Sequence, residues 1–156
     1  MNLKGKYQMK RYMLILVVAD LLMCGCAHQS QTQQAKEAAQ QFVVNPIGKI
    51  VREDGRTFIV MQPKYIEGLL RLDQCSHITV QYWFHKNDTP QKRSILQVYP
   101  RGNKENPLTG VFATHSPVRP NLIAISRVKV ISVKDTVIEI ENIDAFDDSP
   151  VIDIKS

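Results

Sequence analysis

The sequence has few cysteines and glycines, and it lacks the local patterns that several large enzyme classes require. Of its three cysteines, Cys24 and Cys26 end an apolar run near the N-terminus, so Cys75 alone belongs to the rest of the chain. A disulfide framework within that part is therefore excluded. The seven glycines are scattered, and the sequence contains neither a phosphate-cradling glycine loop nor a Gly-x-Ser-x-Gly elbow. Ser116 beside His115 does not make a catalytic triad.

An excess of basic charge is also missing once the N-terminus is set aside. The formal net charge is +5, from 20 basic and 15 acidic residues. Residues 1–25 hold four of the basic residues and one of the acidic ones, which leaves 16 and 14 in the remainder, or +2. The high isoelectric point is therefore poor evidence for a nucleic-acid surface.

Metal-ligand spacing is absent as well. His77 and His85 share a strand face with Cys75, but along a straight strand the two histidines would lie roughly 27 Å apart. They cannot share one ion. The acidic residues around the C-terminus, Asp144, Asp147, Asp148 and Asp153, do not follow EF-hand spacing and are better read as an acidic turn. We therefore expect no metal site.

The N-terminus has the layout of a bacterial lipoprotein leader. Residues 1–12 are basic and polar, and residues 13–23 form an apolar run that is short for a transmembrane helix. Gly25-Cys26 follows, which predicts a lipoprotein-type signal peptide over 1–26 with Cys26 lipidated. An uncleaved anchor and a soluble N-terminus are the alternatives, and Met9 is a second candidate start. Residues 27–41 are glutamine-rich and predict a tether.

The remainder, 42–156, reads as one domain of short strands. Strands are predicted over 47–51, 57–61, 77–86, 94–99, 111–113, 123–133, 136–143 and 151–154, with a short helix over 64–72. Asp54-Gly55 and Lys134-Asp135 are the predicted hairpin turns. Many short strands separated by turn signals favour an all-β, closed or nearly closed barrel with one short helix.

One loop stands out as a candidate binding site. Between Gly110 and Ser126 the chain holds Pro117 and Pro120, each of which restricts the backbone of the residue before it. A loop stiffened in this way can hold His115, Arg119 and Asn121 in set directions. An ordinary proline-rich connection between two strands is the alternative interpretation.

The same loop resembles the signature of the TsaA-like family, whose best-known members are the TrmO-type tRNA methyltransferases. Three further segments resemble the family in the same order: 45–50 at the opening strand, 68–86 in the middle and 144–155 at the end. The resemblance implies a TsaA-like (TrmO-like) β-barrel over 42–156 and a homodimer. It also implies tRNA as a partner and S-adenosylmethionine as the cofactor.

The residues that the resemblance assigns to the cofactor are His85, Lys86, His115, Ile125, Asp147, Asp148, Ser149 and Pro150. The family acceptor is the exocyclic nitrogen of a threonylcarbamoyl-modified adenosine in tRNA. Its threonyl carboxylate suits a guanidinium fork, so we assign Arg119, with Asn121 beside it, to substrate binding. No residue is assigned to catalysis, because the sulfonium methyl is already activated and the protein mainly supplies geometry and a dry pocket.

The sequence also departs from the family pattern. The family usually has arginine at His115, and residues 51–64 are too short for its proline-arginine-glutamine cofactor motif. The resemblance, the leader and these departures lead to three hypotheses for the function. The first is a diverged methyltransferase domain of the TrmO type. The second is a lipid-anchored envelope module that binds a ligand without methyl transfer, and the third is a structural envelope lipoprotein. The leader favours the cell envelope; without it, the expected location is the cytoplasm.

Overall fold

The computed structural model describes residues 41–156. The predicted signal peptide 1–26 with Cys26, and nearly all of the predicted tether 27–41, lie outside the described residues. Val44–Ser156 forms one structural unit, and the fold below is that unit. Among the described residues, no helix combines the length and the apolar character needed to cross a membrane.

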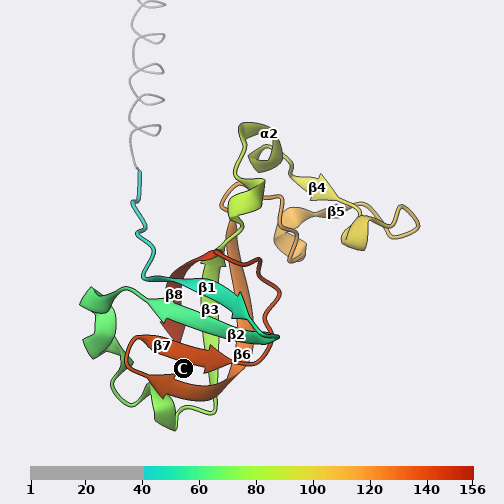
Figure 1. Cartoon of the computed structure of the whole chain (residues 1–156). Helices are drawn as coiled ribbons and strands as arrows, with labels where there is room; N and C mark the ends of the chain where they lie inside the picture. Colours follow the sequence, from blue (N-terminus) through green and yellow to red (C-terminus); the bar gives the residue numbers. More distant parts are fainter. Residues whose placement is uncertain (1–40) are drawn as a thin grey trace, which may run out of the picture. The chain divides into compact units, whose positions relative to one another are not determined.

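The predicted all-β barrel is confirmed. Within residues 41–156, antiparallel strands close into a barrel in the order β1-β2-β7-β6-β3-β8 (Figure 1). The barrel strands are β1 (Gly48–Glu53), β2 (Arg56–Met61), β3 (His77–Trp83), β6 (Ile123–Lys134), β7 (Val137–Ile140) and β8 (Pro150–Lys155). The seam between β1 and β8 is short, since only Gly48 with Val151 and Lys49 with Pro150 pair across it.

Tight turns join the consecutive strands, as the sequence predicts. At the β1–β2 turn, Asp54 and Gly55 both take positive φ, at 50° and 75°, which is the geometry of a two-residue hairpin turn. The β6–β7 turn lies one residue later than predicted. There Asp135 takes φ 51° and β7 begins at Val137.

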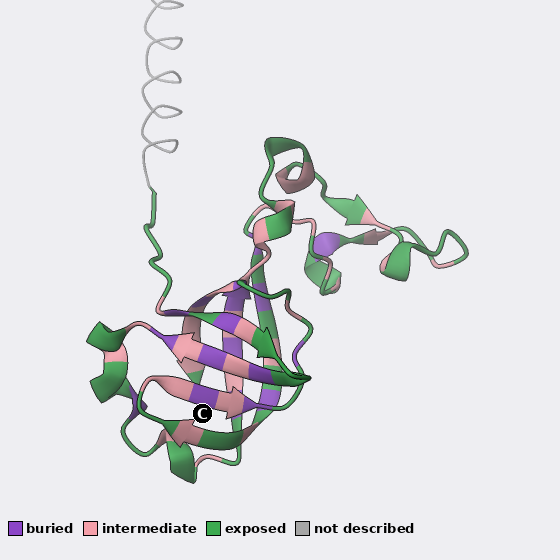
Figure 2. Ribbon diagram, viewed as in Figure 1, coloured by how far each residue is buried: buried purple, intermediate pink, exposed green. Residues whose placement is uncertain are grey.

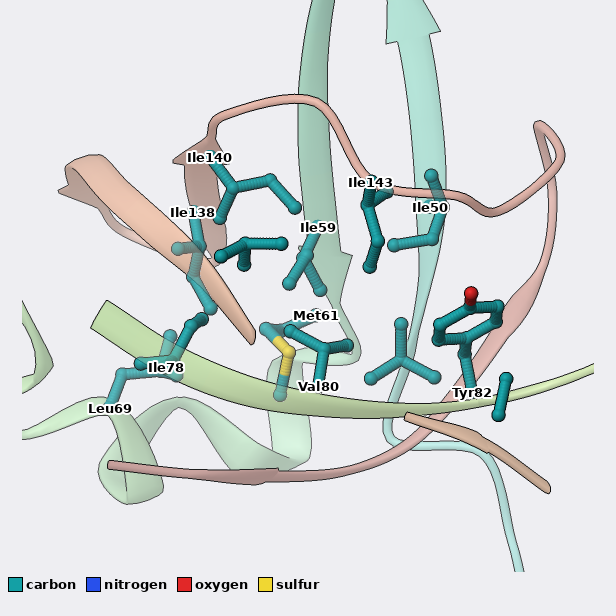
Figure 3. Packing of buried hydrophobic residues seen from close by; sticks show 13 residues of the cluster. Ile50, Ile59, Met61, Leu69, Ile78, Val80, Tyr82, Ile138, Ile140 and Ile143 are labelled. Carbon is teal, nitrogen blue, oxygen red and sulfur yellow. The ribbon is translucent and has the colours of Figure 1, made fainter. Parts of the chain in front are cut away.

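Inward-facing and outward-facing side chains alternate along the strands, and the inward-facing ones form the core. Ile78, Val80 and Tyr82 of β3 are buried, whereas His77, Thr79 and Gln81 face outward (Figure 2). Side chains from opposite strands meet inside the barrel (Figure 3). The fully buried members include Ile50, Ile59, Val80, Ile138 and Val151. The period of two therefore identified the inward face correctly.

Helical turns fill the connections more than the sequence predicts. The expected helix over 64–72 is a 3-10 helix, η1 (Pro63–Leu69), followed by η2 (Leu72–Gln74). The strand predicted to run to residue 86 ends at Trp83, and η3 (His85–Asn87) follows. A one-turn helix, α2 (Pro90–Arg93), occupies the next positions because Thr89 caps it and proline starts it.

Two predicted strands are wrong in the segment between β3 and β6, which we call the excursion. Residues 88–120 leave the barrel here and carry their own two-stranded sheet, β4 (Gln97–Val98) with β5 (Thr109–Gly110), and η4 (Pro100–Gly102) (Figure 1). The strand predicted over 94–99 shrinks to β4. The one predicted over 111–113 is the 3-10 helix η5 (Val111–Ala113). In η5 the N–H of Thr114 turns back to the carbonyl of Val111, and none of the three residues joins the β4–β5 ladder.

Candidate functional site

Two adjoining clefts lie where β3 ends and β6 begins. The large cleft has a volume of about 450 Å³ and the small cleft about 230 Å³. The large cleft is lined by Tyr82, Phe84, Lys86, Asn87, Lys92, His115, Pro117, Asp144, Ala145, Phe146 and Ser149. The small cleft is lined by Tyr82, Phe84, His115, Arg119, Ile123, Ala124, Ile125, Ser126 and Asp144. Four residues are common to both, so the clefts form one continuous site.

The floor between the clefts is aromatic. Phe84 packs edge-on against Tyr82, with ring centroids 5.8 Å apart and planes at 73°. The Tyr82 hydroxyl donates a hydrogen bond to the carbonyl of Asp144 and lies 3.4 Å from Ser126 Oγ. Burial raises the pKa of Tyr82, so the phenol stays protonated and keeps donating to the loop carbonyl.

The closing loop, residues 141–149 between β7 and β8, forms one wall. Its Phe146 ring lies 4.1 Å below Lys86 Nζ, a cation–π contact that brings an ammonium to the cleft. Ser149 is buried, and its hydroxyl lies 3.3 Å from His85 Nδ1. Lys86 and Ser149 line the large cleft, and His85 supports it through Ser149.

Other predicted residues of this loop turn away from the clefts. Asp147 Oδ1 accepts a hydrogen bond from the backbone N–H of Arg52 at 2.9 Å, and Asp148 Oδ1 pairs with Lys49 Nζ at 2.7 Å. The hydrogen bond from Lys49 lowers the pKa of Asp148, whose backbone takes φ 60°. Pro150 opens β8. The two carboxylates thus tie the closing loop to β1 and do not line either cleft.

The proline-rich loop also contributes to both cleft linings. His115 lines both clefts, and Arg119 lines the small cleft. The Arg119 guanidinium reaches the carbonyl of Thr114 through one long bond of 3.4 Å. Ile125 lines the small cleft and remains half exposed, while Asn121 is exposed and outside both linings. The loop therefore brings His115 and Arg119 together but not Asn121.

A cluster at the base of residues 88–120 anchors the proline-rich loop. Asp88 accepts from Trp83 Nε1 at 3.0 Å and from Arg93 Nε at 2.7 Å, and Arg93 also donates to the carbonyl of Pro120 at 3.0 Å. The hydrogen bond from Arg93 lowers the pKa of Asp88. One arginine thus joins the start of the excursion to its end and fixes the approach of the proline-rich loop.

Sequence reasoning missed the aromatic part of the site. Tyr82 and Phe84 fit the strand pattern and read as core, although both line the clefts. Phe146 offered a usable signal, because a lone aromatic ring within an acidic turn has little to pack against locally. It is 56% exposed in the structure. Within residues 41–156, no three histidine, cysteine or acidic side chains come together as a metal-binding group.

The chain matches one protein family over most of its length. The family model of the tRNA-methyltransferase O N-terminal domain matches residues 31–156. A probable S-adenosyl-L-methionine-binding protein of Methanocaldococcus jannaschii is 44% identical over 114 residues, which cover 73% of this chain and 90% of that protein. A probable S-adenosyl-L-methionine-binding protein of Pyrococcus horikoshii is 47% identical over 116 residues, covering 74% and 82%.

Solved structures agree with the barrel. The crystal structure of TrmO from Pseudomonas aeruginosa is 26% identical with a TM-score of 0.56, and covers 74% of this chain. A second TrmO crystal structure is 28% identical with a TM-score of 0.57 over the same share. The matched region spans 55% and 57% of those two chains. On the family model and the two archaeal relatives together, the chain belongs to the tRNA-methyltransferase O N-terminal domain family.

Proposed function

We propose that residues 42–156 form a TrmO-like methyltransferase domain that binds S-adenosylmethionine in the large cleft. One observation carries the proposal. Lys86, His115 and Ser149, which the resemblance assigned to the cofactor from three distant segments, line a single cleft. The two archaeal relatives named as probable S-adenosyl-L-methionine-binding proteins support this choice of ligand.

The chemistry of the cleft suits that cofactor. A volume of about 450 Å³ lies in the usual range for small-molecule sites. The Lys86 ammonium can hold the carboxylate of the amino-acid end, and the exposed Asp144 carboxylate can accept from ribose hydroxyls or from the amino group. Phe146 and Phe84 offer rings for the adenine. When bound, the cofactor supplies an already activated methyl group; this chain orients it and limits water around it.

Arg119 is the proposed anchor for the methyl acceptor. Its side chain lines the small cleft, which adjoins the large one, and makes a single long hydrogen bond among the described residues. Most of its fork can therefore bind a carboxylate such as that of a threonylcarbamoyl adenosine in tRNA. A tRNA (adenine(37)-N6)-methyltransferase of Mus musculus, 37% identical over 87 residues, supports an acceptor of this class. That match covers 56% of this chain and 20% of the mouse protein.

A second function fits the departures from the family. The two-residue turn at Asp54-Gly55 and the direct entry of β2 into η1 leave no segment for the proline-arginine-glutamine motif. With His115 in place of arginine, the site has one fewer fixed positive charge. Together with the predicted leader, this favours a lipid-anchored envelope module that binds its ligand without methyl transfer. A reporter fused after Ser156 separates the two functions, since a signal on the outer side of the membrane supports the envelope module.

We propose in addition that the domain forms a homodimer. Large apolar side chains are exposed on residues 88–120 and on β6, and exposed apolar surface can mark a protein–protein contact. They are Ile95, Leu96, Tyr99, Leu108, Phe112, Ile123, Ile125 and Ile131. Phe112 is 77% exposed, so Phe112→Ser should shift the mass measured by light scattering from dimer to monomer. A wild-type chain that is already monomeric would contradict the proposal.

Cofactor binding is the decisive experiment. The full chain, purified with mild detergent, is titrated with S-adenosylmethionine by calorimetry beside Lys86→Met and Lys104→Met. We expect micromolar binding by the wild type, a loss of about tenfold for Lys86→Met, as for one charge-assisted bond, and no change for Lys104→Met. Lys104 is exposed and outside both cleft linings. Absence of binding up to millimolar concentration would overturn the methyltransferase proposal.

A further inference from the structure

Arg52 of β1 lines neither cleft, and its side chain makes an unusual number of contacts with the closing loop. Its Nη1 donates to Asn142 Oδ1 at 2.9 Å. Its Nε and Nη2 both donate to the carbonyl of Ala145, at 3.2 and 3.0 Å, and Nη2 also donates to the carbonyl of Ile143. The planar guanidinium thus spans four consecutive residues of the loop.

The loop has few other polar attachments over this stretch. Its backbone is bonded to the barrel at both ends, where Glu141 donates to Lys129 and Asp148 donates to Ile50. Among the described residues, the backbone between these ends meets the barrel through two side chains. Tyr82, which lines both clefts, binds the carbonyl of Asp144, and Arg52, which lines neither, binds those of Ile143 and Ala145. Neither contact could be inferred from sequence, because Tyr82 is 62 positions from Asp144 and Arg52 is 90 positions from Asn142.

The residues that Arg52 holds are those that shape the cleft wall. Asp144, Ala145 and Phe146 line the large cleft, and they occupy or immediately adjoin the positions whose carbonyls the guanidinium binds. We propose that Arg52 is a positioning residue that keeps the closing loop in its cofactor-binding form. This inference rests on the proposed function, because it assigns a cause to the affinity of that same cleft.

The physical argument is one of preorganisation. A loop that is ordered only part of the time weakens the apparent affinity in proportion to the competent fraction. Arg52→Gln removes most of the guanidinium donors, so the closing loop is ordered for less of the time in the free protein. The free energy needed to order it must then be supplied by cofactor binding. Arg52→Lys keeps the charge but offers one compact ammonium, so it should restore part of the hold. Ile143 is buried in the core, so its packing is the alternative explanation for an ordered closing loop.

The test combines hydrogen exchange with titration of S-adenosylmethionine on the full chain. For Arg52→Gln we expect faster amide exchange in residues 142–149, unchanged exchange in β3 and β6, and an affinity about tenfold weaker, as for a loop ordered a tenth of the time. Arg52→Lys should lie between. Saturating cofactor should restore the protection of the loop. Arg56→Gln is the matched control, because that arginine binds Glu139 at 2.6 and 2.7 Å and leaves the loop untouched.

Each contrary result has a distinct meaning. Unchanged exchange in 142–149 would overturn the proposal, since Ile143 and Tyr82 would then suffice. Unchanged affinity despite a loosened loop would also overturn it. A uniform rise of exchange across the barrel would assign Arg52 to general stability. A wild-type chain that binds no S-adenosylmethionine would overturn the proposed function, and the cofactor role of Arg52 with it.

Discussion

Tyr82 shows how one residue serves both the core and the site. Its ring belongs to the barrel core, and its hydroxyl ends at the closing loop. A buried hydroxyl needs a partner, and here the partner is a carbonyl that no strand bonds. Removal of the hydroxyl therefore affects loop and core together, whereas removal of Ser126 Oγ would affect only the weaker of its two contacts.

The raised pKa of Tyr82 predicts a pH dependence of stability. Burial is the main cause of the shift from the ordinary value of 10.0. Above that pH the unfolded chain ionises first and releases its proton, so the folded state loses stability as pH rises through the folded pKa. Tyr82→Phe removes this dependence. We expect the wild type to lose stability relative to the variant above about pH 10 in urea unfolding; parallel curves up to pH 11.5 would contradict the assignment.

Around neutral pH we expect the same variant to be less stable than the wild type. Tyr82→Phe leaves the carbonyl of Asp144 without its donor and should lower the free energy of unfolding by about 1 kcal/mol. Denaturant unfolding at pH 7 measures this loss directly. Equal stability of the two proteins would mean that water replaces the hydroxyl at the loop.

At the scale of elements, the contact between β1 and β2 depends on a missing side chain. A Cβ added at Gly48 would lie 2.6 Å from the carbonyl oxygen of Val60 and 3.1 Å from the Cα of Met61. Both are backbone atoms, so no rotamer change relieves the clash. Gly48 also pairs with Val151 at the short seam that closes the barrel.

Gly48→Ala should therefore destabilise the protein, by roughly 1–3 kcal/mol. Gly68→Ala is the control, because an added Cβ there meets nothing within 4 Å and the residue does not need positive φ. The control should be neutral or slightly stabilising. Thermal unfolding of the two variants tests the difference, and a Gly48→Ala protein as stable as the Gly68→Ala protein would rule out the clash.

At the scale of the whole molecule, the barrel is built from residues after 46. Among the described residues 41–156, every member of the core cluster and its packed neighbours lies between Ile47 and Ile154. Because strands within residues 41–156 close the barrel among themselves, we expect removal of residues 1–40 to leave the melting temperature within about 2 °C of the full chain. That is an effect of at most a few tenths of a kcal/mol for a domain of this size. Tryptophan fluorescence of Trp83 can follow both proteins. A fall of more than about 5 °C would show that the removed segment stabilises the barrel.

Much of the fold could be read from local patterns. Alternation along β3, and the pair Asp54-Gly55, specified an inward face and a turn without reference to the rest of the chain. The failures came where a segment had no strand partner. Residues 94–99 and 111–113 have strand-like composition, yet only Gln97 and Val98 of the first stretch, and none of the second, join the small β4–β5 sheet. Partner availability is a tertiary property, so composition could not decide it.

The candidate site, like the fold, could be predicted only in part from the sequence. The sequence by itself determined which side chains are available. The prolines marked the loop with His115 and Arg119 as a candidate, and the family resemblance then favoured it over an ordinary connection. Only the tertiary structure decided which of the candidates meet. It placed Lys86, His115 and Ser149 in one cleft, turned Asp147 and Asp148 toward Arg52 and Lys49, and brought Phe146 under Lys86. The physical reason is closure of the barrel. β8 pairs with both β1 and β3, and this pairing sets where the closing loop lies and which way it points.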